Sequence, residues 1–209
     1  MIEKFLNLEK EKQDRIVNAA IKEFAQKGYD HASTNNIVKA AGISKGLLFH
    51  YFKNKKGLFL FLFDHCVKLI TKEYYQKTDL TEADFFKRIR QAVQIKMNLI
   101  AQFPEIFKFI EAAYLEDSAE VRTELEERIE ALIGDNIAKV YEGIDTSRFR
   151  DDMDLQKILK IITWTFEQLS KEITLKAKLS PSPARKIDYD AAVREANEYF
   201  EILIKCFYK

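Results

Sequence analysis

Five residues between positions 45 and 50 have the chemistry and spacing to contact the bases of double-stranded DNA. In a short helix from Lys45 to about Tyr51, Leu48 would point toward a core, and the other side would present Lys45, Gly46, Leu47, Phe49 and His50. Polar and apolar side chains on one exposed helical face can bond and pack against base edges in the major groove. These residue types therefore indicate nucleic-acid recognition.

Two short helices joined by a tight turn are expected to position these residues. Ser33 and Thr34 are types that cap helix N-termini, and the first helix would run to about Ala41. Gly42 can adopt the left-handed conformation that ends a helix, and Ser44 can cap the second helix. A helix, a turn with glycine and a second helix form the helix-turn-helix arrangement, whose second helix enters the major groove.

Apolar residues at helical spacing give this unit its expected core. The residues expected to converge there are Ile37, Val38, Ala41, Ile43, Leu48 and Phe52. An amphipathic helix over residues 11–27 precedes them and stops at Gly28. Together these patterns predict a three-helix domain over residues 1–54.

The chain carries a net charge of only +1, but its N-terminal part is basic. Residues 1–57 hold ten lysines and one arginine against six acidic residues, a net charge of +5, so the remainder carries −4. A basic head on a slightly acidic body is typical of a protein that touches nucleic acid with one end. The alternative is chance enrichment of lysine in this segment.

The rest of the sequence is expected to be helical, which gives an all-α fold of about nine helices. Six glycines and three prolines in 209 residues leave few places to break the chain. Helices are expected over residues 55–77, from Thr78 or Thr81 to about 103, from Pro104 to 114, over 118–141 and 154–178, and at the C-terminal end. Residues 143–154 would be an irregular connection, and residues 180–186 a loop.

Several other classes of protein are disfavoured. The two cysteines lie far apart without metal-ligand spacing, and we expect free thiols in a reducing cytoplasm. The longest apolar run, 58–63, is six residues, against roughly 20 for a membrane span, and the charged opening does not read as a signal peptide. No HExxH motif, glycine-rich phosphate loop or nucleophile elbow is present. We therefore expect a cytoplasmic protein that is not an enzyme, without a metal or cofactor.

The N-terminal residues resemble the TetR family of bacterial transcriptional repressors. The resemblance covers about the first 60 residues and is carried by Ile16, Ala19, Ala20, Phe24, Gly28, Thr34, Ile37, Ala41-Gly42-Ile43-Ser44-Lys45-Gly46, Leu48, Tyr51-Phe52, Asn54-Lys55 and Leu58. It implies a homodimer whose N-terminal domains bind a DNA operator. It also implies that a C-terminal domain over residues 55–209 binds a small ligand and releases the operator.

Carried over to this sequence, the resemblance makes residues 44–51 the recognition helix. Thr34 would bond a phosphate, Lys45 would reach a base or a phosphate, and Gly46 would allow close approach of the backbone. Tyr51 and Lys55 would hold the phosphate backbone.

Two residues depart from the family pattern. Phe49 stands where tyrosine is usual, which removes one phosphate hydrogen bond, and Leu47 stands where a small polar residue is frequent. We expect Leu47 to contact a thymine methyl group. Core packing is the alternative for both side chains.

Aromatic residues of the C-terminal region are candidates to line an apolar ligand pocket. The candidates are Phe103, Phe107, Ile110, Tyr114, Trp164 and Phe166, with Glu167 available to a cationic group. Such a pocket would take a small, largely hydrophobic effector. Ordinary core packing of the aromatic residues and a solvated Glu167 are the alternatives.

The last two long helices carry apolar stripes suited to a four-helix bundle across a two-fold axis. We expect them to form the homodimer interface, and the alternative is that both are interior to a monomer. The rival to a DNA-binding regulator is a helical interaction module without catalytic activity, whose basic end binds an acidic protein partner.

Overall fold

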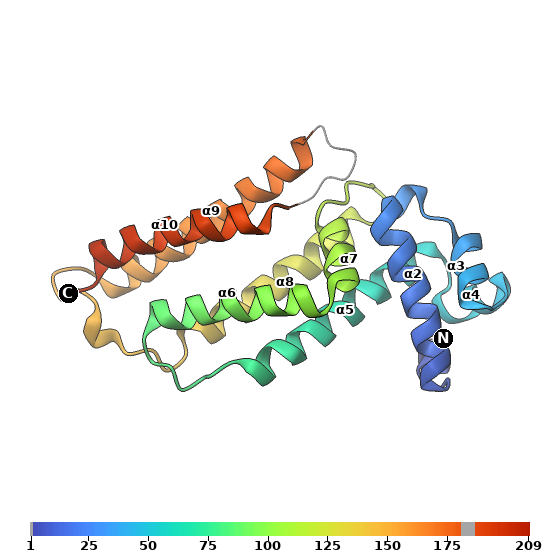
Figure 1. Cartoon of the computed structure of the whole chain (residues 1–209), viewed down its shortest axis with the longest axis horizontal. Coiled ribbons are helices and arrows are strands. Elements are labelled where there is room, and N and C mark those ends of the chain that lie inside the picture. The colour runs from blue at the N-terminus through green and yellow to red at the C-terminus, as the bar shows by residue number, and fades with distance from the viewer. Residues whose placement is uncertain (1, 181–186) are drawn as a thin grey trace. The chain divides into compact units, whose positions relative to one another are not determined.

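The chain folds into helices throughout the part that the structure describes. The structure is a computed structural model that describes residues 2–180 and 187–209; the side chains at positions 133–141 and 178 lie outside the description. Ten α-helices and one short 3₁₀ helix occur in the described ranges, where the only β pairing is an isolated bridge between Phe149 and Tyr208 (Figure 1). The all-α prediction is confirmed.

The sequence patterns predict every one of these α-helices except the first. The elements are α1 (Ile2–Leu6), α2 (Lys10–His31), α3 (Thr34–Ala41), α4 (Lys45–Phe52), α5 (Lys55–Lys77), α6 (Phe85–Gln102), α7 (Pro104–Tyr114), α8 (Arg122–Tyr141), η1 (Thr146–Arg148), α9 (Leu155–Leu179) and α10 (Tyr189–Phe207). Within α2 the helical path is interrupted at Gly28, at φ 66° and ψ −175°, so the predicted stop is present.

Contacts along the chain define two compact units. Unit 1 comprises residues 1–76 and 98–132, and unit 2 comprises residues 77–97 and 133–209. The division falls within α6 and α8 and before the last residue of α5, so it differs from a boundary after residue 54. The assignment of DNA binding to residues 1–54 and of ligand binding and dimerisation to residues 55–209 stays a prediction.

Unit 1 has an aromatic core that joins the helix-turn-helix to α5 and α7. Phe59 of α5 packs edge-on against Phe24 of α2, with ring centroids 5.0 Å apart, and against Phe109 of α7 at 5.4 Å. Ile37 and Leu48, both expected in the core, are fully buried beside them. Burial of such large rings anchors the short helices of the head, which are too short to be stable alone.

Unit 2 is built on α9 and α10, which lie side by side (Figure 1). Its buried core consists of Phe85, Phe86, Phe149, Ile158, Ile162, Phe200 and Leu203. The buried carboxylate of Asp84 pairs with Arg148 and accepts a hydrogen bond from the Tyr208 hydroxyl at 3.3 Å. A buried carboxylate requires such partners to stay charged.

Two helix starts differ from the prediction. Neither Thr78 nor Thr81 caps α6; the helix begins at Phe85, where the Asp84 carboxylate accepts the N–H of Lys87 at 3.0 Å. Aspartate is among the strongest N-cap residues, and Asp84 directly precedes the apolar residues of α6. It therefore caps the helix in place of the two threonines. Helix α8 begins at Arg122 instead of 118. The side chains of Ile133, Ile137 and Tyr141, and residues 181–186 of the expected loop, lie outside the described residues.

Candidate nucleic-acid interface

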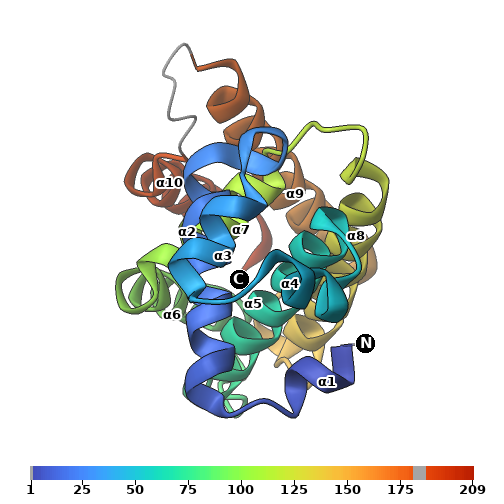
Figure 2. The ribbon, with the colours of Figure 1, turned by 90° about the vertical axis from the view of Figure 1, so that its right-hand side faces the viewer.

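The helix-turn-helix has the caps that its sequence predicts. The Ser33 hydroxyl accepts the N–H of Asn36 at 3.4 Å, and the Ser44 hydroxyl accepts the N–H of Leu47 at 3.2 Å. Gly42 ends α3 in the left-handed conformation, at φ 65° and ψ 38°. These local bonds fix α3 and α4 as two short neighbouring helices (Figure 2).

Helix α4 has one buried and one exposed side. Leu48, Tyr51 and Phe52 are buried. The exposed residues are Ser44 at the N-cap and Lys45, Gly46 and His50 in the helix. At about 100° per residue, Gly46 and His50 lie directly opposite the buried side. This exposed side is the part of α4 that could enter a groove of DNA.

Leu47 and Phe49 lie at the edges of that exposed side. Both are half-buried and pack against the unit 1 core, and the Lys45 ammonium lies 5.8 Å from the centroid of the Phe49 ring. Part of each side chain therefore serves packing, and part is available at the surface.

Thr34 is half-buried at the first position of α3. The neighbouring Ser33 N–H donates to the Glu23 carboxylate at 2.9 Å, and the Asn36 amide donates to the same oxygen at 3.2 Å. Helix α2 thus braces the start of α3 at the place where Thr34 is expected to meet a phosphate.

Lys55 and Tyr51, which are predicted to contact phosphates, contact other residues of the protein in this structure. The Lys55 ammonium donates to the Asp30 carbonyl at 3.0 Å and lies 4.7 Å from the centroid of the Tyr29 ring. Tyr51 is only 5% exposed and packs its ring against Phe5. Both side chains are held by the protein itself, which spacing along the sequence does not reveal.

Helix α1, which is not among the predicted helices, adds a part of this surface. Phe5 is 1% exposed and inserts beside Tyr51 and Phe52 of α4. The Lys4 ammonium lies 3.4 Å from Nε2 of His50. Ile2, Phe5 and Leu6 recur at helical spacing, which could have indicated the helix.

Gly57 brings the start of α5 against the end of α4. A Cβ at this position would overlap the carbonyl oxygen of Phe52, and the Gly57 N–H donates to the Asn54 side chain at 2.7 Å. The two backbones therefore meet without a side chain between them.

The candidate effector residues fall in both units. In unit 1, Phe107 is buried, and Phe103, Ile110 and Tyr114 are half-buried. Burial raises the pKa of the Tyr114 hydroxyl. In unit 2, Trp164 is 56% exposed, Phe166 packs on Phe200 at 4.5 Å between ring centroids, and Glu167 is half-buried. Trp164 therefore does not line an enclosed pocket in this structure, and core packing accounts for Phe166.

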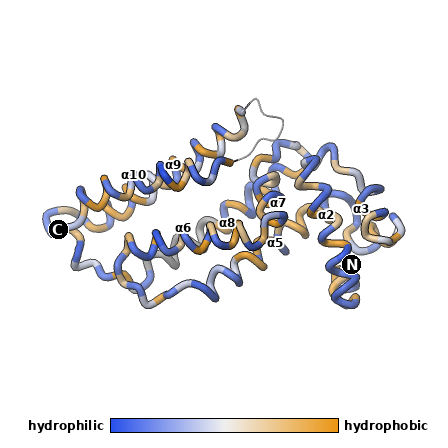
Figure 3. The backbone as a smooth tube through the Cα atoms, in the orientation of Figure 1, coloured by the Kyte–Doolittle hydropathy of each residue, from blue (hydrophilic) through white to orange (hydrophobic). Residues whose placement is uncertain are grey.

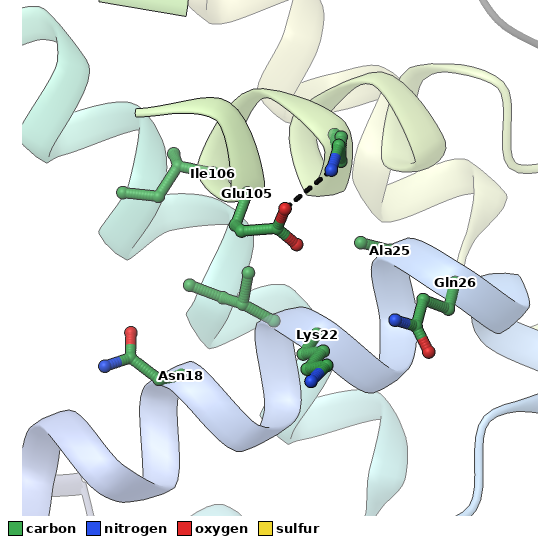
Figure 4. Close-up of a pocket in the computed structure, with 8 residues that line it drawn as sticks. Asn18, Lys22, Ala25, Gln26, Glu105 and Ile106 are labelled. Carbon is green, nitrogen blue, oxygen red and sulfur yellow. Dashed lines mark hydrogen bonds and ion pairs between the residues drawn. The ribbon is translucent and has the colours of Figure 1, made fainter. Parts of the chain in front are cut away.

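A groove of about 410 Å³ lies elsewhere, between α2 and α7 of unit 1 (Figure 4). Ile21, Ala25 and Ile106 form its apolar part. Lys22 and an ion pair between Glu105 and Lys108, at 2.6 Å, lie at its edge. None of the seven candidate effector residues lines this groove.

The residues that the structure describes lack two further features. No group of three or more histidine, cysteine or acidic side chains in those ranges is arranged to hold a metal ion. No helix among them is both long enough and apolar enough to cross a membrane.

The capped pair of helices, with an exposed side on the second and a basic head around it, defines a helix-turn-helix DNA-binding protein. Comparison with known proteins agrees. Residues 16–62 match the family model described as bacterial regulatory proteins, tetR family. Residues 16–62 therefore form a DNA-binding domain of the TetR type, and the chain as a whole is similar in fold to members of that family.

Individual relatives are similar to different extents. The HTH-type transcriptional regulator YuxN of Bacillus subtilis is 41% identical over 69 residues, which are 33% of this chain and 21% of that protein. The chain thus spans about a fifth of this relative's length. Among solved structures, a TetR family regulator from Chloroflexus aurantiacus superposes with a TM-score of 0.61 at 23% identity, covering 99% of this chain and 98% of that one. FadR from Bacillus subtilis, solved in complex with stearoyl-CoA, gives 0.60 at 18% identity, covering 91% and 96%.

Proposed function

We propose that this protein is a repressor that binds a DNA operator through α4 and leaves it when a small, largely hydrophobic effector binds. The observation that carries the first part is the exposed side of α4, where Gly46 and His50 lie opposite buried Leu48 and Lys45 is exposed at the first turn. Residues 1–57, with their net charge of +5, supply the attraction to phosphates.

Lys45 is the lysine best placed to contact DNA. It is exposed at the first turn of α4, whereas Lys55 is bonded to Asp30. Ser44 and Thr34 would bond phosphates from the starts of α4 and α3, where the helix dipoles favour anions. Gly46 would let the backbone approach a base, and Phe49 would support Lys45 from the side.

A mobility shift with double-stranded DNA from beside the protein's own gene tests this proposal. Lys45→Ala should weaken binding, and Lys27→Ala, which removes an exposed lysine at the far end of α2, is the matched control. Affinity should fall steeply as salt is raised, because phosphate-bound counterions are released. A protein that ignores these DNA fragments at low salt and instead binds an acidic polypeptide would support the rival interaction module.

Leu47 is proposed to read a thymine methyl group with the half-exposed part of its side chain. Selection of preferred operators from a random library, with the wild type and with Leu47→Thr, tests this. An unchanged preference would mean that Leu47 serves packing alone.

We propose that the effector binds among the helices of residues 55–209, which we expect to form the ligand-binding and dimerisation domain. The half-buried aromatic residues Phe103 and Tyr114 offer apolar surface there, and FadR, of similar fold, was solved with stearoyl-CoA. Acyl-CoA thioesters of several chain lengths are therefore the first compounds to test. The readouts are a rise in the thermal unfolding midpoint and release of bound DNA, because a ligand stabilises the state that it binds.

We propose that two copies associate through α9 and α10. On α9, the exposed side chains Ile161, Trp164, Leu175 and Leu179 fall within about 60° of one another, roughly 100° from the stripe that packs in unit 2. Tyr199 and Ile202 are exposed on α10. Hydrophobic residues recur along the whole length of both helices (Figure 3). A second apolar stripe on a helix favours burial against another copy.

In such a dimer the two copies of α4 would face successive major grooves, about 34–36 Å apart along the duplex. The protein would have no catalytic role and would act in the cytoplasm, where an operator is accessible.

A further inference from the structure

Helix α1 is anchored directly to the recognition helix. The ring of Phe5 lies 5.9 Å from that of Tyr51 and 4.9 Å from that of Phe52, and it also meets Phe61 of α5 at 5.3 Å. The side-chain amide of Gln13 donates to the carbonyl oxygens of Leu6 and Leu8, at 2.9 and 2.8 Å. These contacts fix where the residues of α1 lie relative to α4.

The anchoring places a second cationic side chain beside the exposed side of α4. Lys4 and His50 are both exposed, and 3.4 Å separates the Lys4 ammonium nitrogen from Nε2 of His50. His50 lies opposite the buried residues of α4, so the pair is at the surface that would meet DNA. Because α1 flanks α4 (Figure 2), Lys4 would lie at the wall of the groove, where the phosphates are.

The chemistry of the pair suits one phosphate group. An ammonium group has three donors and no acceptor, and a neutral imidazole has one donor and one acceptor. In the free chain Lys4 can donate to the imidazole, but most of its hydrogen-bonding capacity faces solvent. A phosphate oxygen can accept from both side chains at once.

We propose that Lys4 and His50 together bind one backbone phosphate of the operator, so that α1 is an additional part of the DNA-binding surface. The inference rests on the proposed function, because it requires α4 to lie in a groove of duplex DNA. It assigns to Lys4 a positioning contact that carries no sequence information itself.

The experiment measures the affinity of the full chain for a duplex from beside its own gene over a range of potassium chloride concentrations. Each phosphate contact contributes about 0.9 to the slope of log K against log salt. Lys4→Gln should lower that slope by about one for each head that is bound and weaken binding about tenfold at low salt. Lys10→Gln, which removes the same charge from an exposed lysine at the start of α2, is the control and should change the slope much less.

Two further variants separate this contact from a purely internal one. His50→Gln combined with Lys4→Gln should cost less than the sum of the single losses, because both side chains hold the same phosphate. Phe5→Ala, which keeps the lysine but frees α1, should lower the slope as Lys4→Gln does. A wild-type slope in Lys4→Gln, with only its unfolding midpoint changed, would show that the pair bonds internally and would overturn the inference.

The outcomes also separate this inference from the proposed function. If the wild type binds no duplex even at low salt, the proposed function fails. If the wild type binds and loses affinity with Lys45→Ala, but Lys4→Gln binds as the wild type does, only the role of α1 fails.

Discussion

The carboxylate of Glu116 accepts a 2.6 Å hydrogen bond from the backbone N–H of Tyr29, which lies 87 residues earlier in the chain. Its other oxygen accepts the N–H groups of Asp117 and Ser118, at 3.1 and 2.9 Å. The Ser118 hydroxyl in turn donates to the Asp30 carboxylate at 2.7 Å. The connection between α7 and α8 therefore holds the last turn of α2, beyond the interruption at Gly28, in place.

Replacing Glu116 tests this connection. Glu116→Gln leaves one carbonyl oxygen for three N–H donors and turns an amide nitrogen, which cannot accept, toward the others. We expect a loss of about 1–3 kcal/mol in the free energy of unfolding, measured in urea. Glu127→Gln, an exposed residue of α8, is the control and should stay within about 0.5 kcal/mol of the wild type. A wild-type unfolding curve for Glu116→Gln would contradict the role.

Two glycines of the head should respond to alanine in opposite ways. Gly28 has a conformation that only glycine adopts readily, and a Cβ there would lie 3.3 Å from the Glu116 carboxylate. Gly28→Ala should therefore destabilise the fold by about 1–3 kcal/mol. At Gly46 an added Cβ meets nothing within 4 Å.

Gly46→Ala should stabilise α4 by about 0.5–1 kcal/mol, because alanine loses less backbone entropy than glycine when it becomes helical. If the α4 backbone approaches a base closely, the same variant should lose operator affinity despite its higher stability. Thermal unfolding and a mobility shift on one preparation provide both readouts. Wild-type affinity would exclude close approach at Gly46.

The two cysteines should differ sharply in reactivity. Cys66 is fully buried, and burial raises the pKa of its thiol to about 12, so it stays protonated at pH 8. Cys206 is exposed on α10. Iodoacetamide at pH 8 should spare Cys66 in the native protein and label it in guanidinium chloride. Cys206 lies on the side of α10 that carries Tyr199 and Ile202, so it should be labelled faster in the monomeric Trp164→Glu variant than in the dimer. Mass spectrometry of the digested protein reads the result, and native labelling of Cys66 would contradict its burial.

Trp164 tests the proposed dimer interface. Trp164→Glu puts a charge in the second apolar stripe of α9, which a dimer would bury without a partner. The sedimentation mass should fall from two chains to one. Ser170→Glu, exposed on the other side of α9, should leave the mass unchanged. A wild-type mass of one chain would remove the dimer proposal.

His65 should make stability depend on pH. Burial, followed by the charge of Lys10, lowers the pKa of this half-buried imidazole below its ordinary value of 6.5; Lys68 acts in the same direction and Asp14 opposes it. The unfolded chain therefore binds the proton more readily, and stability should fall as pH drops below about 6.5. Urea unfolding at pH 7.5 and pH 5.5 should show a smaller drop for His65→Gln than for the wild type. His31→Gln, at an exposed position, should behave as the wild type.

Local signals in the sequence predict most of the secondary structure. Ser33, Gly42 and Ser44 act through bonds that close within a few residues, so their caps can be read from the sequence. The α6 start was wrong because three polar types compete within seven residues, and only the folded connection selects Asp84. The signal for helix α1 consists of only three apolar residues, Ile2, Phe5 and Leu6, and the burial of Phe5 depends on residues nearly fifty positions away.

The candidate site could be predicted only in part, for a similar reason. The exposed side of α4 follows from helical spacing alone. By contrast, Lys55 bonds to Asp30, and Lys4 lies beside His50, through contacts between distant segments. Sequence spacing indicates which residues are basic, but not which charges are already satisfied by the protein.

The position of α4 depends on the absence of a side chain at Gly57. Because Gly57 has no side chain, the first turn of α5 packs directly against the carbonyl oxygen of Phe52, the last residue of α4. Even the methyl group of alanine would push the two helices apart. The added methyl group would change the orientation of α4, although none of the side chains of α4 would be altered. A genetic screen for lost DNA binding should therefore recover changes at codon 57, although Gly57 lies outside α4.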